Sequence, residues 1–134
     1  MPDVTTLTNE QIAKQIERSV VAADVELFRA VYAEGAVVYH ALADAEMSVD
    51  ASLRVLQAVL DVTERLWYED VRITATESGY VDQHYACLKL RNGADVRIPA
   101  VMVVTVEDNL VTRLDEYLEG GAAAPVSQAL AAAG

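Results

Sequence analysis

The sequence LVTRLDEYLE, residues 110–119, alternates between two sets of side chains, as the residues of a β-strand do. One set is Leu110, Thr112, Leu114, Glu116 and Leu118, and the other is Val111, Arg113, Asp115, Tyr117 and Glu119. The first set is apolar apart from Thr112 and Glu116, so it predicts the buried face. A carboxylate on such a face is costly to bury without a partner. Glu116 therefore indicates either an exposed strand end or a polar site in a pocket.

The segments around this strand predict more strands joined by tight turns. An apolar run at residues 101–106 ends in Glu107-Asp108-Asn109, which predicts a hairpin turn before the closing strand. Asn92-Gly93 is a strong signal for a second hairpin. The expected strands are residues 36–42, 69–76, 80–91, 95–106 and 110–119.

Apolar residues at helical spacing predict three helices in the first half of the chain. Thr8 and Gln11 match a capping box, and Asp24 is a good N-cap for a second helix that Gly35 can end. Ser48 or Asp50 can cap a third helix, and residues 43–48 before it predict a loop. The apolar stripe of this third helix is Leu53, Leu56, Leu60, Thr63 and Trp67.

This order of elements predicts an α+β fold with helices on one face of a curved antiparallel sheet. We expect a single domain over residues 1–121, followed by an alanine-rich tail over residues 122–134 that is a frayed helix or disordered. A sheet curled over helices in this way leaves a cone with an apolar cavity.

The composition excludes several classes of function. The formal net charge of −11 argues against nucleic acid and against an anionic membrane surface as partners. No apolar run is long enough to cross a bilayer. Cys87 is the single cysteine, which excludes an internal disulfide framework, and the N-terminal sequence lacks a signal-peptide pattern. These features favour a cytoplasmic protein.

Three motifs resemble one superfamily. They are DVELF at residues 24–28, YAEGAVV at residues 32–38 and RLDEYLE at residues 113–119. They are similar to motifs of the superfamily of nuclear transport factor 2, ketosteroid isomerase, limonene epoxide hydrolase and the SnoaL-like cyclases. The resemblance implies the NTF2-like (cystatin-like) α+β roll, a cone-shaped curved antiparallel sheet wrapped over three helices. It also implies a homodimer formed through the outer face of the sheet. Because this fold hosts enzymes and binding modules alike, it leaves the activity open.

Carrying the superfamily's catalytic residues onto this chain excludes two mechanisms. The base aspartate of ketosteroid isomerase matches His40, whereas its oxyanion residues match Ile16 and a position near Val101, which cannot donate. The Arg-x-Asp pair of limonene epoxide hydrolase matches Tyr85 and Cys87. The second aspartate of that hydrolase matches Glu116, and SnoaL-like cyclases also carry an acid on the closing strand. The chain therefore resembles the SnoaL-like proteins best.

His40, His84 and Glu116 are each a polar exception on an otherwise apolar strand face. In a cone fold such a face looks into the cavity, so these three side chains predict one polar site within hydrogen-bond reach in an apolar pocket. His40 would act as the base or acid, Glu116 as its partner and His84 as a second donor. The expected substrate-binding residues are Tyr39, Trp67, Tyr85, Leu114 and Met102. A metal site built from the three polar residues is an alternative, but their spacing matches no ligand motif and we expect neither metal nor cofactor.

Three functions are compatible with these patterns. The first is a cofactor-independent acid–base enzyme, of cyclase, isomerase or hydrolase type, acting on a small hydrophobic molecule. The second is a non-catalytic binding module for an apolar ligand, and the third is a homodimerisation domain. The residues expected on the dimer face are Val111, Arg113, Tyr117, Tyr85 and Cys87.

Overall fold

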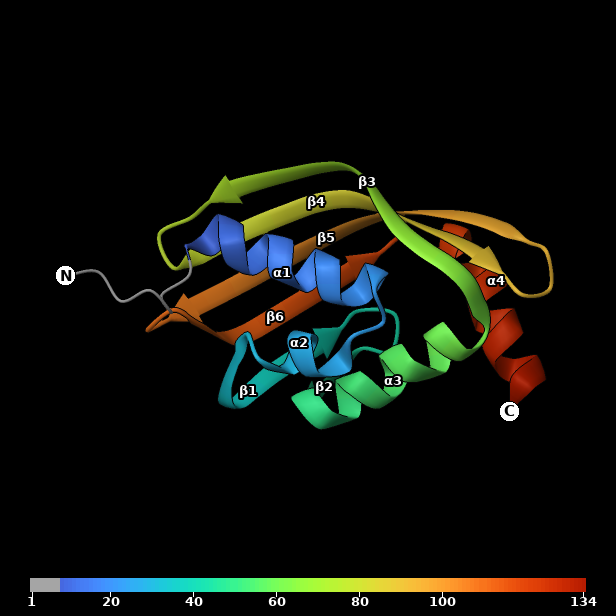
Figure 1. Cartoon of the computed structure of the whole chain (residues 1–134), viewed down its shortest axis with the longest axis horizontal. Coiled ribbons are helices and arrows are strands. Elements are labelled where there is room, and N and C mark those ends of the chain that lie inside the picture. Colours follow the sequence, from blue (N-terminus) through green and yellow to red (C-terminus); the bar gives the residue numbers. More distant parts are fainter. Residues whose placement is uncertain (1–7) are drawn as a thin grey trace.

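The computed structural model describes residues 8–134, and residues 1–7 of the expected domain lie outside the described part (Figure 1). Six strands form one open sheet in the order β2-β1-β6-β5-β4-β3. The strands β1 and β6 pair in parallel, and the other neighbouring strands pair antiparallel. The α+β class is confirmed, but the sheet is mixed rather than wholly antiparallel. The strands are β1 Tyr32–His40, β2 Ala45–Ser48, β3 Thr63–Ala75, β4 Gly79–Leu90, β5 Asp95–Glu107 and β6 Leu110–Leu118.

Four helices accompany the sheet within the described residues, one more than expected. They are α1 Asn9–Val21, α2 Val25–Arg29, α3 Val49–Asp61 and α4 Gly120–Ala133. Helix α1 contacts β3 and β4, α3 contacts β1, and α4 contacts β5. Figure 1 shows α1, α2 and α3 on one side of the sheet and α4 at one end. No helix over residues 8–134 is long and apolar enough to span a bilayer.

The capping signals at the first three helices are confirmed, but two helix ends were placed wrongly. Thr8 and Gln11 form the expected capping box, Asp24 caps α2, and Ser48 caps α3. However, α2 ends at Arg29, so Gly35 lies inside β1, where it has a φ of +77° at a register irregularity. Glycine adopts this left-handed backbone without steric cost.

The third helix is shorter than its apolar stripe predicts. It ends at Asp61, and both Thr63 and Trp67 belong to β3. Spacings of three and four residues continued by coincidence into a strand, where the side-chain period is two. The segment before this helix is also different, because residues 45–48 form strand β2 beside β1 instead of a loop.

The alanine-rich C-terminal segment is a helix that packs against the fold. The side chain of Glu119 accepts hydrogen bonds from the backbone N–H groups of Gly121 and Ala122, which caps α4. Alanine has the highest helix propensity, and Ala123 and Val126 are buried against the core. The tail expected to be frayed or disordered is therefore an ordered part of the fold.

A bulge shifts the alternation at the start of β6. The register with β5 changes between Thr105 and Val106, so Val111 is fully buried while Leu110 is partly exposed. An extra residue in one strand turns every earlier side chain to the other face. The expected alternation holds only beyond the bulge, where Leu114 is buried. Val111 therefore belongs to the core and not to the outer face.

Candidate functional site

A cavity of about 330 Å³ lies between the sheet and the helices. Residues of all six strands and all four helices line it, and most of the lining side chains are aliphatic or aromatic. This size is at the lower end for small-molecule sites, which are typically apolar with a few polar groups. The polar side chains in the lining are Tyr32, His40, Ser52, Tyr68, His84, Glu116 and Ser127.

Three of these residues form one hydrogen-bonded group, which we call the His40 cluster: His40, Glu116 and Ser52. The parallel register of β1 and β6 sets His40 directly beside Glu116, and their Nδ1 and Oε1 atoms are 3.1 Å apart. Ser52 lies one turn into α3, and its Oγ is 3.2 Å from the Nε2 of His40. The side chains of His40 and Glu116 are 20% and 26% exposed, so the cluster is accessible from solvent.

The hydrogen-bond pattern of the His40 cluster fixes which atoms can face a bound molecule. A carboxylate only accepts, so Nδ1 of His40 donates to Glu116, and in the neutral ring Nε2 then accepts from the Ser52 hydroxyl. Both ring nitrogens are therefore occupied. The second carboxylate oxygen of Glu116 has no hydrogen-bond partner among residues 8–134. That oxygen is the free acceptor of the cluster, whose three residues all line the cavity.

Asp82 and His84 form a second pair, which we call the deep pair. Nδ1 of His84 is 2.8 Å from Oδ1 of Asp82, and the two side chains are only 2% and 1% exposed. The imidazole stacks on the ring of Tyr68, with centroids 3.9 Å apart and planes 14° apart. In the sheet, Met102 pairs with both Glu116 and Asp82 and so lies between the two polar groups.

Two tyrosines, Tyr32 and Tyr68, also line this cavity. The hydroxyl of Tyr32 is buried and has no hydrogen-bond partner among the described residues. Burial raises the pKa of Tyr32, and the nearby Tyr80 and Glu116 add to that effect. Burial likewise raises the pKa of Tyr68 well above its ordinary value, with Glu116 and Asp82 contributing. Both groups therefore stay protonated near neutral pH and can donate hydrogen bonds.

The structure places five of the eight expected site residues in the cavity lining. These are His40, His84, Glu116, Leu114 and Met102. It does not bring the three polar residues into one hydrogen-bonded group, because His84 bonds to Asp82 whereas His40 bonds to Glu116. Within residues 8–134, no group of three or more His, Cys, Asp or Glu side chains is arranged to hold a metal ion.

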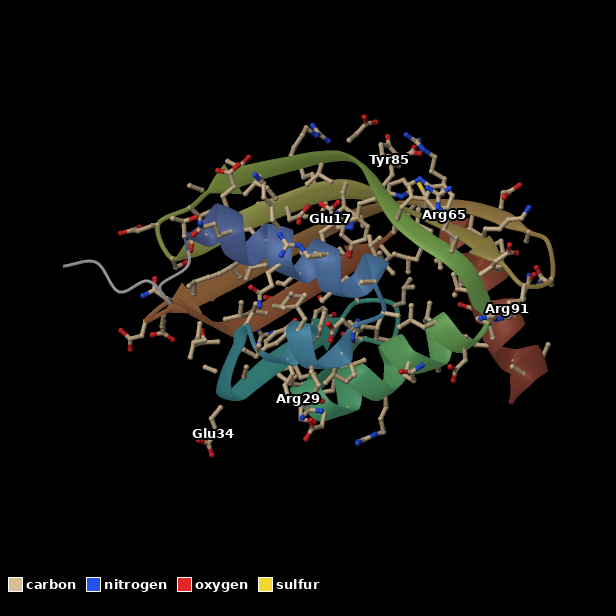
Figure 2. All side chains as sticks on the ribbon, viewed as in Figure 1. Glu17, Arg29, Glu34, Arg65, Tyr85 and Arg91 are labelled. Atoms are coloured by element: carbon tan, nitrogen blue, oxygen red, sulfur yellow. The ribbon has the colours of Figure 1, made fainter. Side chains whose placement is uncertain are left out.

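The other three expected site residues, Tyr39, Trp67 and Tyr85, do not line the cavity, so that prediction is wrong. Tyr39 follows the opposite face of β1 from His40, and its hydroxyl is 2.8 Å from the carboxylate of Asp44. Trp67 donates to Glu69, and the guanidinium of Arg97 lies 3.5 Å from the ring centre of Tyr85. Figure 2 shows Tyr85 at the β3–β4 side of the sheet, away from α3.

Four polar residues of the cavity lining were missed from sequence, namely Tyr32, Ser52, Tyr68 and Ser127, and so was Asp82, the partner of His84. Asp82 had a signal, because it lies two residues before His84 on the same strand face. Ser52 had a weaker one, since it follows the cap Ser48 by about one helical turn. Tyr32 was assigned to a helix that ends earlier, and Tyr68 lay between an expected helix and an expected strand.

The sequence matches no protein-family model and no curated protein. Solved structures do match. A candidate SnoaL-like polyketide cyclase from Shewanella denitrificans has a TM-score of 0.75 at 15% identity, covering 90% of this chain and 96% of that chain. IdmH, a candidate polyketide cyclase from Streptomyces antibioticus, has a TM-score of 0.78 at 12% identity, covering 91% and 99%. An NTF2-like protein from Burkholderia xenovorans has a TM-score of 0.71 at 20% identity, covering 92% and 98%. With helices on one face of a curved sheet and a cavity between them, the chain has the SnoaL-like, NTF2-like fold.

Proposed function

We propose that the protein is a cofactor-independent acid–base enzyme that acts on a small hydrophobic molecule in the cavity. The observation that carries this proposal is the His40 cluster, a hydrogen-bonded carboxylate, imidazole and hydroxyl at the wall of an apolar cavity. A cavity that only stored an apolar ligand would gain nothing from such a group, because partly burying it costs free energy. The solved structures named as polyketide cyclases support the cyclase type among the possible reactions.

In this proposal Glu116 exchanges the proton with the substrate. Its free carboxylate oxygen removes a proton from a carbon next to a carbonyl group, and the electron pair moves onto the carbonyl oxygen. His40 holds the carboxylate in place through its Nδ1–H, and Ser52 holds the ring through Nε2. Tyr32 and Tyr68 are protonated donors in the same cavity, suited to stabilise the developing oxyanion.

The test uses a ketone that needs no second substrate. The protein is incubated with alpha-tetralone in deuterated water, and replacement of the acidic C–H hydrogens is followed by proton NMR. We expect exchange faster than in buffer, and a loss of about a hundredfold or more in the Glu116→Gln variant, as for removal of a general base. Tyr85→Phe, on the outer face, is the control and should exchange like wild type. Equal exchange by wild type and Glu116→Gln would contradict the proposal.

A second candidate, an ester hydrolase, is favoured by Ser52. Ser52 Oγ, the His40 ring and Glu116 follow one another at 3.2 Å and 3.1 Å, the order of a nucleophile, base and orienting acid. A fluorophosphonate probe that labels wild type but not Ser52→Ala, together with hydrolysis of para-nitrophenyl butyrate, would support this activity. The absence of labelling would leave proton exchange at Glu116 as the better description.

We propose further that the protein forms a homodimer through the outer face of the sheet. Tyr117 is 47% exposed and Val103 is 39% exposed, and Tyr85 and Arg97 stack on the same face. Aromatic and arginine side chains around exposed apolar groups are typical of protein interfaces. Sedimentation at micromolar concentration should give twice the monomer mass, and Tyr117→Asp should shift it towards the monomer. A monomeric wild type would contradict this assembly.

A further inference from the structure

The deep pair is costly to keep where it is, and the proposed reaction at Glu116 does not use it. Its side chains are the least exposed ion-pairing groups described, at 1% for Asp82 and 2% for His84. A buried pair of this kind is often no more stabilising than apolar side chains of similar volume. His84 also lines the cavity, so the pair faces the space in which a ligand would lie.

The deep pair is separate from the His40 cluster. Glu116 on β6 and Asp82 on β4 flank the same residue of β5, Met102, so their backbones are two strand spacings apart, about 10 Å. The two carboxylates are bonded to different histidines. The His40 cluster is the more exposed of the two, and Leu42, two residues after His40, is 52% exposed and also lines the cavity. The cavity therefore has an outer polar point and an inner one.

His84 is held so that one nitrogen remains available. Its Nδ1 donates to the carboxylate of Asp82, and its ring is fixed against Tyr68 by stacking. Its Nε2 has no hydrogen-bond partner among residues 8–134. In a neutral imidazole bonded in this way Nε2 is an acceptor, which suits a hydroxyl group. Met102 lies between the two polar points, and the neighbouring lining side chains Ala86, Ile98 and Leu114 are also apolar.

We propose that His84, positioned by Asp82 and Tyr68, binds a hydroxyl group at the inner end of the substrate. The substrate is then a largely apolar, ring-containing molecule that carries oxygen at both ends, one end at Glu116 and the other at His84. This inference rests on the proposed function, because it takes the cavity as the substrate site. It assigns His84 to binding rather than to proton transfer, and it sets the length and polarity of the substrate class.

The test compares rigid diols with their mono-hydroxyl counterparts. The probes are a naphthalenediol with hydroxyls on opposite rings against beta-naphthol, and hydroquinone against phenol as a pair too short to span the cavity. Dissociation constants are measured by calorimetry at one pH. One buried hydrogen bond should make the second hydroxyl of the naphthalenediol improve affinity about fivefold to tenfold. The second hydroxyl of hydroquinone should give no such gain.

Two variants and one control test whether the gain in affinity from the second hydroxyl depends on His84. His84→Phe keeps an aromatic ring against Tyr68 but leaves Asp82 unpaired, which can prevent folding. Asp82→Leu with His84→Phe removes the pair without leaving a buried charge. Tyr85→Phe, on the outer face of the same strand, is the control. In wild type, NMR should also show the His84 ring signals moving on addition of the naphthalenediol and contacts between its far ring and Tyr68.

The outcomes separate this inference from the proposed function. A gain present in wild type and Tyr85→Phe but absent in the double variant supports the inference. The same gain in the double variant, or unmoved His84 signals at saturation, overturns it while leaving proton exchange at Glu116 intact. If none of the probes binds, the inference is also overturned. Failure of wild type to exchange tetralone, with the binding results as expected, would contradict only the proposed reaction at Glu116. The binding experiment needs no turnover, so the two failures are distinguishable.

Discussion

Replacing His84 by phenylalanine should destabilise the protein strongly, although phenylalanine is also an aromatic residue. The ring can still stack on Tyr68, but Asp82 loses its bonded partner at a position where its side chain is 1% exposed. Removing one member of a buried pair costs about 3–5 kcal/mol. Against a total stability of about 5–15 kcal/mol for a domain, this is a large fraction.

The matched double variant, Asp82→Leu with His84→Phe, should behave differently. Replacing both members of a buried pair by apolar side chains is close to neutral or stabilising, so we expect a stability within about 1 kcal/mol of wild type or above it. Asp82→Leu alone leaves the Nδ1–H of His84 unsatisfied, at about 1–3 kcal/mol. The double-mutant cycle should therefore give a coupling of at least about 3 kcal/mol.

Urea unfolding gives the stability of wild type, the two single variants and the double variant, with the fluorescence of the single tryptophan, Trp67, as the signal. Trp67 lies on β3 outside the cavity, so these substitutions do not touch it. Two results would refute the reasoning: a His84→Phe variant within 1 kcal/mol of wild type, or a double variant that loses the sum of the two single losses. Either would mean that Asp82 is not held as a buried partner of His84.

Two further substitutions, Glu17→Gln and Tyr32→Phe, should each raise the stability of the fold. Burial raises the pKa of Glu17 on α1, beside β3 (Figure 2), and the Asp82 carboxylate adds to this while His84 opposes it. A carboxyl group whose pKa is raised in the folded state stabilises the fold while it is protonated and destabilises it as pH rises and it ionises. Glu17→Gln should therefore be more stable than wild type at pH 7. The difference between their urea midpoints should become smaller towards pH 4. A difference in urea midpoint that stays constant with pH would show that ionisation of Glu17 does not destabilise the fold. Tyr32→Phe removes a buried hydroxyl that has no partner among the described residues, so it should raise stability by about 1 kcal/mol in thermal unfolding. The same variant should catalyse tetralone exchange more slowly. A melting temperature below that of wild type would contradict the stability prediction.

The elements that carry strong local signals were predictable from the sequence. Thr8, Asp24 and Ser48 are caps whose side chains bond to the nearby backbone, so their effect is readable within four residues. Elements set by distant contacts were not predictable in this way. Helix α4 is fixed by burial of Ala123 and Val126 against the fold, and β2 exists because it pairs with β1.

In the candidate site, the strand face of each polar side chain was predictable from local sequence, whereas the hydrogen-bond partners were predictable only in part. Alternation along one strand sufficed to place His40, His84 and Glu116 in the cavity lining, since a side chain's face is a local property. The bond between His40 and Glu116 depends on the register of β1 with β6, whereas the bond between His84 and Asp82 lies within β4. The sequence therefore predicted the polar groups of one cavity and the pairing of His40 with Glu116, but not that His84 bonds to Asp82 instead of joining them.

The parallel pairing of β1 and β6 has a consequence for synthesis of the chain. His40 and Glu116 are 76 positions apart, and they meet only when the last strand inserts beside the first. A nascent chain that has released β1 to β5 from the ribosome already carries His40, Ser52 and the deep pair, yet it has neither the acid nor the α4 wall of the cavity. The His40 cluster thus becomes complete only after β6 has been made and released. A chain shortened before β6 would be without its acid, whatever part of its sheet had formed.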